Sequence, residues 1–167
     1  MKTFKVAFVG DSGVGKTSLI KAFLGEDVKS VRSTIGIDFF SIVKDSYNIT
    51  VWDFAGQQWF REVLINMLRG AALVVMVFDL SRPKTLQNLI KYWAPQVKKF
   101  CGDRTVVIVV GNKKDIKKID DDVIISAIDE IKKNINVKLY LQTSALLGEN
   151  VSKLFDTIFE LVKVTQI

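Results

Sequence analysis

One nine-residue segment near the amino terminus restricts the possible folds more than any other part of this 167-residue chain. It has the sequence GDSGVGKTS over residues 10–18. The apolar residues 6–9 before it predict a buried strand, and residues 17–24 predict a helix after it. Such a loop turns backbone N–H groups and a helix N-terminus toward one point, where they would bind phosphate. The Lys16 ammonium would bind the β- and γ-phosphates and the Thr17 hydroxyl a Mg²⁺ ion, with an ordinary glycine-rich turn as the alternative.

Four later residues would make such a site sensitive to the γ-phosphate. Asp53 follows an apolar run and can hold Mg²⁺ through the water shell of the ion. In the sequence DFAGQ that begins there, Gly56 offers an unobstructed backbone N–H to the γ-phosphate. The Gln57 amide both donates and accepts, so it can orient an attacking water. Thr34, in a polar stretch, would bind Mg²⁺ only while the γ-phosphate is present, which predicts a conformational switch.

A fourth motif, NKKD, follows the apolar residues 106–110 and would select the base. It lies at the C-terminal end of a predicted buried strand, where doubly wound α/β folds bind ligands. The Asp115 carboxylate can accept hydrogen bonds from N1–H and the exocyclic amino group of guanine, which adenine does not offer in that arrangement. Asn112 and Lys113 would brace the loops and cover the base, and the backbone N–H of Ala145 would bind the guanine carbonyl oxygen. Taken alone, NKKD could also be an ordinary polar turn.

These motifs, in this order, make the chain similar to small GTPases of the Ras superfamily over the whole core domain of that family. STIGIDF, WDFAGQ and RGA resemble the Rab branch, whereas YWAPQVKKFC before VGNKKD resembles the Rho branch. The segment from Asp115 to Ser144 is too short to hold the additional Rho helix. We therefore interpret the chain as Rab-like or as a member of an unassigned branch.

The resemblance implies an α/β fold, a P-loop NTPase G domain, as a single domain over residues 1–167. Its sheet should have six mostly parallel strands with one antiparallel edge strand, surrounded by about five helices. We expect Pro95 to kink the helix that starts at Pro83, because proline lacks the N–H donor and crowds Lys91. The strands are expected at 6–9, 39–43, 49–52, 71–78, 106–110 and 137–141, and helices at 17–24, 83–100, 120–133 and from Val151 onward.

The resemblance also implies the site and its ligands, which are GTP or GDP with Mg²⁺. The residues expected to contact the nucleotide are Asp11, Ser12, Gly13, Val14, Gly15, Lys16, Thr17, Ser18, Thr34, Gly56, Asn112, Lys113, Asp115, Ser144, Ala145 and Leu146. The expected Mg²⁺ ligands are Thr17, Thr34 and Asp53, and the catalytic residues Gln57, Lys16, Thr34 and Gly56.

The preferred function is that of a molecular switch that hydrolyses GTP to GDP and phosphate, in membrane traffic or in cytoskeletal or signalling regulation. One alternative is an interaction module that binds GTP with little or no hydrolysis. A nucleoside or nucleotide kinase would need an arginine-rich lid, which the sequence lacks. We expect effectors, exchange factors and activating proteins to bind residues 34–39 and 57–67, which run from Thr34 to Phe39 and from Gln57 to Met67.

Several residues differ from the family pattern. Asp27, Val28 and Lys29 occupy the region where relatives carry an aromatic residue over the guanine, which predicts looser nucleotide retention. Leu146 replaces a lysine that Rab proteins usually have. Arg32 could act as a built-in arginine finger, although a solvated loop arginine is the simpler interpretation. Trp59 replaces an arginine and could join Phe39, Trp52 and Met67 in an apolar patch that depends on nucleotide state, or pack inward.

Composition limits the remaining possibilities. Hydrophobic residues make up 49% of the chain, enough for the core of one domain. The single cysteine, Cys101, cannot form an intramolecular disulfide, and with no leader segment we expect a cytoplasmic protein. The net charge of +6 comes largely from lysine pairs, which leave an anionic membrane surface open as a partner. The sequence does not interleave aromatic and basic residues as a groove that stacks nucleic-acid bases would need, so we expect no nucleic-acid partner. We also expect a monomer. The end, VKVTQI, lacks a prenylated cysteine, so the chain was trimmed or lacks that anchor.

Overall fold

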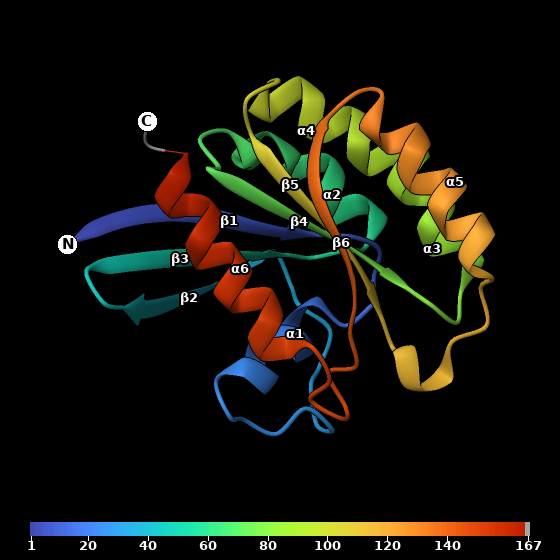
Figure 1. The fold of residues 1–167 in the computed structure, drawn as a ribbon, viewed down its shortest axis with the longest axis horizontal. Coiled ribbons are helices and arrows are strands. Elements are labelled where there is room, and N and C mark those ends of the chain that lie inside the picture. Colours follow the sequence, from blue (N-terminus) through green and yellow to red (C-terminus); the bar gives the residue numbers. More distant parts are fainter. Residues whose placement is uncertain (166–167) are drawn as a thin grey trace.

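The chain folds around one six-stranded sheet with the strand order β2-β3-β1-β4-β5-β6 (Figure 1). The computed structural model describes residues 1–165. Strands β2 and β3 pair antiparallel and all other neighbours pair parallel, which confirms the predicted sheet with its antiparallel edge strand. The strands are β1 (Lys2–Val9), β2 (Ile37–Lys44), β3 (Tyr47–Phe54), β4 (Leu73–Asp79), β5 (Val106–Asn112) and β6 (Asn136–Gln142).

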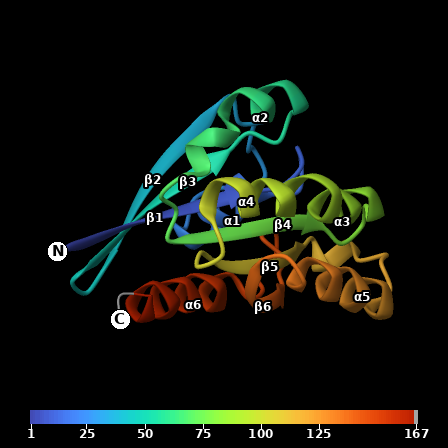
Figure 2. The same ribbon diagram turned by 90° about the horizontal axis from the view of Figure 1, so that it is seen from above.

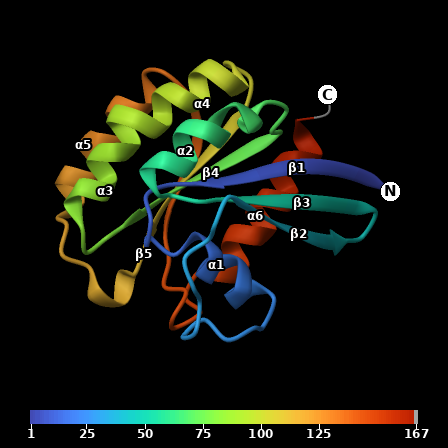
Figure 3. The ribbon, with the colours of Figure 1, turned by 180° about the vertical axis from the view of Figure 1, so that it is seen from behind.

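Helices cover both faces of the sheet, and this explains why its central strands are continuous apolar runs. Every residue of β4 and β5 is buried, as expected for parallel strands with helices on both sides. Helices α1 (Lys16–Phe23) and α6 (Val151–Val164) pack on one face. The other face carries α3 (Pro83–Asn88), α4 (Ala94–Cys101) and α5 (Asp121–Lys132), with α2 (Gln58–Leu64) beside them (Figure 3). The apolar stripe of α6 faces the sheet at the helical spacing that the sequence predicted.

Helices α3 and α4 form one rod that a π-helical turn, Leu89–Trp93, interrupts. Pro95 lies at the start of α4, one turn after Lys91. Because proline cannot donate to a carbonyl of the preceding turn, the wider π turn absorbs the mismatch. The helix predicted over residues 83–100 is thus interrupted just before Pro95, and the kink at Pro95 stays a prediction.

Three features differ from the sequence-based expectation. Strand β1 begins at Lys2 rather than at residue 6, because its first half pairs with β3 from Lys2 opposite Tyr47 onward. Helix α2 and the 3₁₀ turn Ile65–Leu68 after it were not predicted, and α2 buries no residue fully. A second 3₁₀ turn, Lys114–Ile116, follows β5. Of the C-terminal residues VKVTQI, residues 166–167 lie outside the described part.

The C-terminal ends of the parallel strands meet at one edge and bring polar residues together. Asp53 lies at the end of β3, and Asp79 of β4 is in register with Asn112 of β5. Thr143 follows β6 directly. The start of β1 and the end of α6 lie together at the other end of the molecule (Figure 2). The edge formed by Asp53, Asp79, Asn112 and Thr143 is therefore the place to look for a site.

Candidate functional site

The loop between β1 and α1 forms the wall of a hollow at this edge. Lys16 is only 6% exposed, and its ammonium donates to the carbonyl oxygens of Gly10 (2.8 Å) and Asp11 (3.0 Å). Burial lowers the pKa of Lys16 to about 8, against the opposing charges of Asp53 and Asp11. Phosphate oxygens would restore the charge that burial disfavours. The hollow is lined by Ser12, Gly13, Gly15, Lys16, Thr17, Ser18, Val31, Arg32, Ser33, Thr34, Gly56, Gln57 and Lys113.

Thr17, Thr34 and Asp53 converge beside Lys16, as the sequence predicted for a Mg²⁺ site. The Thr17 hydroxyl donates to Asp53 Oδ2 and lies 2.8 Å from the Thr34 hydroxyl, which is 3.3 Å from the same Oδ2. Asp53 Oδ1 is buried and has no hydrogen-bond partner in the described structure. An unpaired buried carboxylate oxygen next to two hydroxyl groups is a donor set of the kind that Mg²⁺ prefers, so these residues fit the ion.

Gly56 and Gln57 line the same hollow, and Gly56 packs against the backbone of residues 10–12. A Cβ atom on Gly56 would lie 2.2 Å from the backbone nitrogen of Ser12 and 2.4 Å from the carbonyl carbon of Asp11. Only glycine therefore permits this approach of the two loops. Gln57 lines the same hollow, and its Oε1 atom is buried without a partner. An orphaned acceptor at this point can take a hydrogen bond from a bound water.

Asn112 forms hydrogen bonds both to the loop between β1 and α1 and to the loop after β6. Its Nδ2 donates to the carbonyl of Val14 at 3.0 Å. Its Oδ1 accepts from the Thr143 hydroxyl at 3.0 Å and from the backbone N–H of Ala145 at 3.2 Å. The bracing role predicted for Asn112 is visible in these contacts. The N–H of Ala145, which we expected to bind a base carbonyl, is thus directed toward Asn112 here.

Ser144, in the loop after β6, holds the Asp115 carboxylate. The Ser144 hydroxyl donates to Asp115 Oδ1 at 2.7 Å and accepts from the backbone N–H of Leu147 at 3.2 Å. Asp115 itself is exposed, so it keeps acceptor capacity for a ligand. Ser144 therefore orients Asp115, the residue expected to recognise guanine.

Asp115 lies in a second hollow that adjoins the first, since both contain Gly15, Ser18 and Lys113. Val28 is in this second hollow, at the place where relatives were expected to carry an aromatic residue. Aliphatic side chains thus form much of its wall, which suits the face of a planar base. The second hollow is lined by Gly15, Ser18, Val28, Asn112, Lys113, Asp115, Ile116, Ala145 and Leu146.

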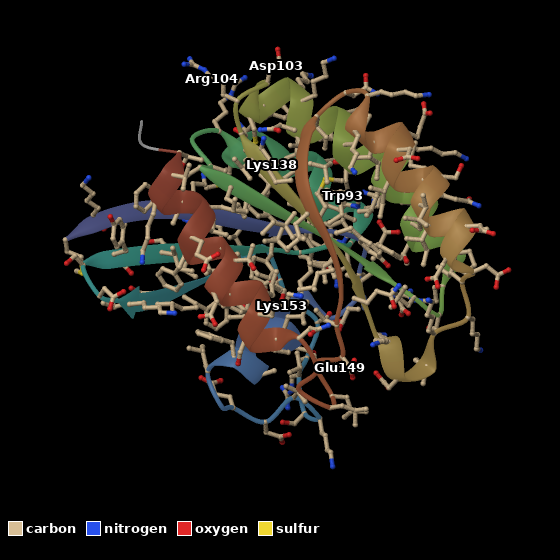
Figure 4. The ribbon with its side chains drawn as sticks, in the orientation of Figure 1. Trp93, Asp103, Arg104, Lys138, Glu149 and Lys153 are labelled. Atoms are coloured by element: carbon tan, nitrogen blue, oxygen red, sulfur yellow. The ribbon has the colours of Figure 1, made fainter. Side chains whose placement is uncertain are left out.

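Three side chains that the sequence did not point to donate hydrogen bonds to the Asp11 carboxylate. Its Oδ1 accepts from the Trp93 indole N–H at 3.0 Å and from Arg61 at 3.2 Å, and its Oδ2 accepts from the Asn88 amide. The Arg61 guanidinium also lies 4.2 Å from the ring centroid of Tyr92. Trp93 is fully buried between the helical layer and the sheet (Figure 4). No sequence pattern pairs these residues, because they are 50 to 82 positions from Asp11.

A second unpredicted network surrounds the buried Asp79 at the end of β4. Lys113 of the NKKD motif forms an ion pair with its Oδ2 at 2.9 Å, and Arg82 forms another at 3.0 Å. Ser81 donates to Oδ1 through its backbone N–H (2.8 Å) and its hydroxyl (2.6 Å). Burial would raise the pKa of Asp79, but the hydrogen bonds from Ser81, Lys113 and Arg82 together hold the pKa below its ordinary value. The sequence signal that could have found this network is a buried strand ending in Asp with Arg three residues later.

Of the residues proposed for partner binding, Phe39, Trp59 and Met67 are exposed, whereas Trp52 is partly buried. Phe39 packs edge-on against Trp52, with ring centroids 4.8 Å apart. The Lys5 ammonium lies 3.6 Å from the Trp52 ring centroid and donates to the carbonyl of Met67. Trp59 is 65% exposed and stacks on Phe60, its neighbour in α2. Arg32, the candidate arginine finger, is exposed and lines the phosphate hollow.

Comparison with known proteins identifies relatives over nearly the whole chain. Residues 5–164 match the model of the Ras family. The chain is 32% identical over 161 residues to Ras-related protein RABC2a of Arabidopsis thaliana, which covers 93% of this chain and 76% of that protein. It is 33% identical over 175 residues to Ras-related protein Rab-1 of Theileria annulata, covering 98% and 76%. Across residues 1–165, no helix is both long and apolar enough to pass through a membrane.

Proposed function

This chain belongs to the Ras family and is a Rab-like small GTPase, and on that premise we propose how its residues bind GTP, hydrolyse it and switch. One observation carries the assignment. Two unpaired buried acceptors, Asp53 Oδ1 and Gln57 Oε1, lie at one end of adjoining hollows whose other end holds Asp115. A guanine nucleotide with a cation at its phosphates would satisfy both ends at once. We propose residues 1–167 as a single G domain.

Binding would proceed through groups that are already in place. The nucleotide phosphates would take over Lys16 from the carbonyls of Gly10 and Asp11. The guanine would lie against the second hollow and donate to Asp115, which Ser144 holds in position. Mg²⁺, held by Thr17, Thr34 and Asp53, would supply positive charge to the phosphate oxygens.

Hydrolysis would require only positioning and charge from this chain. The Gln57 amide would orient a water whose oxygen attacks the γ-phosphorus while the bond to the β–γ bridging oxygen breaks, which yields GDP and phosphate. The Lys16 ammonium and the Gly56 N–H would stabilise the negative charge that develops on the phosphate oxygens. The buried, unpaired Gln57 Oε1 is the feature that favours hydrolysis over a module that binds GTP without cleaving it.

The switch would act through the two segments that meet the γ-phosphate. Loss of that group would release Thr34 and Gly56, and with them residues 34–39 and 57–67. Effectors, exchange factors and activating proteins of this family would distinguish the two states there. The Rab names of the relatives favour membrane traffic, with the protein in the cytoplasm and peripheral to a membrane.

The test compares phosphate release from GTP, ATP and xanthosine triphosphate by the wild type and by Asp115→Asn. The wild type should cleave GTP alone. An amide at position 115 presents one acceptor and one donor, which match the N1–H and the 2-carbonyl of xanthine, so the variant should prefer that base. Asp122→Asn, an exposed carboxylate in the first turn of α5, is the matched control and should keep GTP preference.

Each other outcome has a definite meaning. GTP binding without phosphate release would support the non-catalytic interaction module. Preference for ATP would support a kinase. A variant that still prefers GTP would remove Asp115 from base recognition.

A further inference from the structure

Arg82, which the preceding assignment leaves unused, connects the phosphate-binding loop to the base-binding loop. Its guanidinium Nη2 donates to the carbonyl oxygen of Ser12 at 3.0 Å, across 70 positions of sequence. Its Nε donates to Asp79 Oδ2 at 3.0 Å. The same Oδ2 accepts the ion pair from Lys113 at 2.9 Å. One guanidinium thus joins a loop carbonyl to a carboxylate that also holds a residue of the second hollow.

The local backbone fixes Arg82 in this position. Its carbonyl accepts from the Thr85 hydroxyl (2.7 Å) and backbone N–H (3.0 Å), and its own N–H donates to the carbonyl of Asp79. Asp79 is only 1% exposed, so the Arg82–Asp79 pair is shielded from water on one side although the Arg82 side chain is 47% exposed. A charge-assisted hydrogen bond anchored on a buried carboxylate is stronger than a pair between two exposed groups.

The contact with Ser12 determines where the next N–H points. The carbonyl of Ser12 and the N–H of Gly13 belong to one trans peptide plane and so point in opposite directions. Ser12 and Gly13 both line the phosphate hollow, whereas Arg82 is not among its described lining residues. Holding the carbonyl toward Arg82 therefore directs the Gly13 N–H to the other side of the loop. Gly13 has a φ of 77°, so this peptide would otherwise be free to rotate.

We propose that Arg82 is a positioning residue that sets the Ser12–Gly13 peptide so that the Gly13 N–H binds the β-phosphate of the nucleotide. It would act on the phosphates and not on the base, because Lys113 has an ion pair of its own with Asp79 that does not pass through Arg82. The forked shape of the guanidinium is needed, because Nε and Nη2 donate to two different acceptors at the same time. This inference rests on the proposed nucleotide site.

The experiment measures GDP and GMP affinity by competition for wild type, Arg82→Ala and Arg82→Lys. Arg82→Ala should lose about tenfold in GDP affinity, the size of one charge-assisted hydrogen bond, through faster dissociation. GMP affinity should stay unchanged, because GMP lacks the second phosphate. Arg82→Lys should not restore GDP affinity, since one ammonium cannot take the place of both donors. The ³¹P NMR shifts of bound GDP should move in both variants.

Two controls separate positioning from a general effect. Lys84→Ala removes an exposed charge two residues away, for which the described structure shows no ion pair, and should bind GDP like the wild type. Thermal unfolding followed by circular dichroism identifies a variant that merely loses stability; in that case the ratio of GDP to GMP affinity still decides.

Three results would overturn the inference. GDP affinity could be unchanged in Arg82→Ala. It could also be fully restored in Arg82→Lys, which would mean that the positive charge alone, and not the fork shape, is needed. GMP affinity could fall as much as GDP affinity, which would place the effect at the base. Failure of the wild type to bind GDP would instead refute the proposed site.

Discussion

The contact of Gly56 with the phosphate-binding loop gives the most direct test of the switch. Replacing Gly56 with alanine adds one Cβ atom, which would lie 2.2 Å from the Ser12 nitrogen and 2.4 Å from the Asp11 carbonyl carbon. Ordinary van der Waals contact begins at 3.4 Å, so the two loops must separate by about 1.2 Å. All three nearest atoms are backbone atoms of the loop, so no side chain can rotate away to relieve the clash.

The cost follows from the usual price of overpacking, about 1–3 kcal/mol. At about 1.4 kcal/mol per factor of ten, the arrangement that brings the Gly56 N–H to the γ-phosphate would become roughly 5- to 150-fold less populated. GDP has no γ-phosphate, and its proposed contacts do not include Gly56. We therefore expect single-turnover GTP hydrolysis to fall about 10- to 100-fold and GDP affinity to fall less, because the loop that the Cβ atom displaces is also proposed to bind the phosphates of GDP.

The assay is quench-flow hydrolysis of prebound GTP, with fluorescent GDP displacement run on the same samples. Gly70→Ala is the control, because its Cβ would meet nothing within 4 Å but its φ of 81° gives backbone strain. That variant should lose stability and keep its hydrolysis rate. Unchanged hydrolysis in Gly56→Ala, or an equal loss of GDP affinity, would refute the link between this contact and the γ-phosphate.

Three further predictions concern single side chains. Arg32→Ala should leave single-turnover hydrolysis unchanged, because Arg32 is exposed; a tenfold fall would identify it as an arginine finger. Trp59 should change fluorescence between GDP and a non-hydrolysable GTP analogue, a change that Trp59→Phe abolishes, and identical wild-type spectra would exclude Trp59 from the switch. Burial raises the pKa of Cys101 to about 11, so at pH 8 roughly one thiol in a thousand is ionised. Its reaction with a disulfide reagent should therefore be far slower in the folded than in the guanidinium-unfolded protein, and equal rates would contradict the burial.

The sequence predicted the sheet well because the parallel strands carry a strong signal. Strands β4 and β5 are apolar up to their last residues, Asp79 and Asn112, which are polar residues of the site. Helix α2 was missed because it is short and buries no residue fully, and its Arg61 reaches Asp11 across 50 positions. Residues 112–115 were recognisable because motif spacing is local in the chain.

The contacts that hold the site together were not predictable in the same way. Asn112 binds Val14 across 98 positions, and Arg82 binds Ser12 across 70. Such pairs depend on which loops the strand order brings side by side, here the loops after β1, β4 and β5. Residue types show that these side chains can donate hydrogen bonds, but only the folded arrangement shows to which acceptor.

Two buried aspartates, at the ends of the strands β3 and β4 on either side of β1, differ in how their oxygens are satisfied. Asp79 receives donors from Ser81, Lys113 and Arg82, which hold its pKa below the ordinary value although burial opposes them. Burial raises the pKa of Asp53 instead, more than the Thr17 hydrogen bond and the Lys16 charge lower it, and its Oδ1 stays unpaired. A carboxylate already satisfied by cations of its own chain has little to gain from a metal ion, whereas one with an orphaned oxygen has much to gain. The proposed cation site therefore lies at the end of β3, whereas Asp79 holds Arg82 and Lys113 of the loops that would flank the nucleotide.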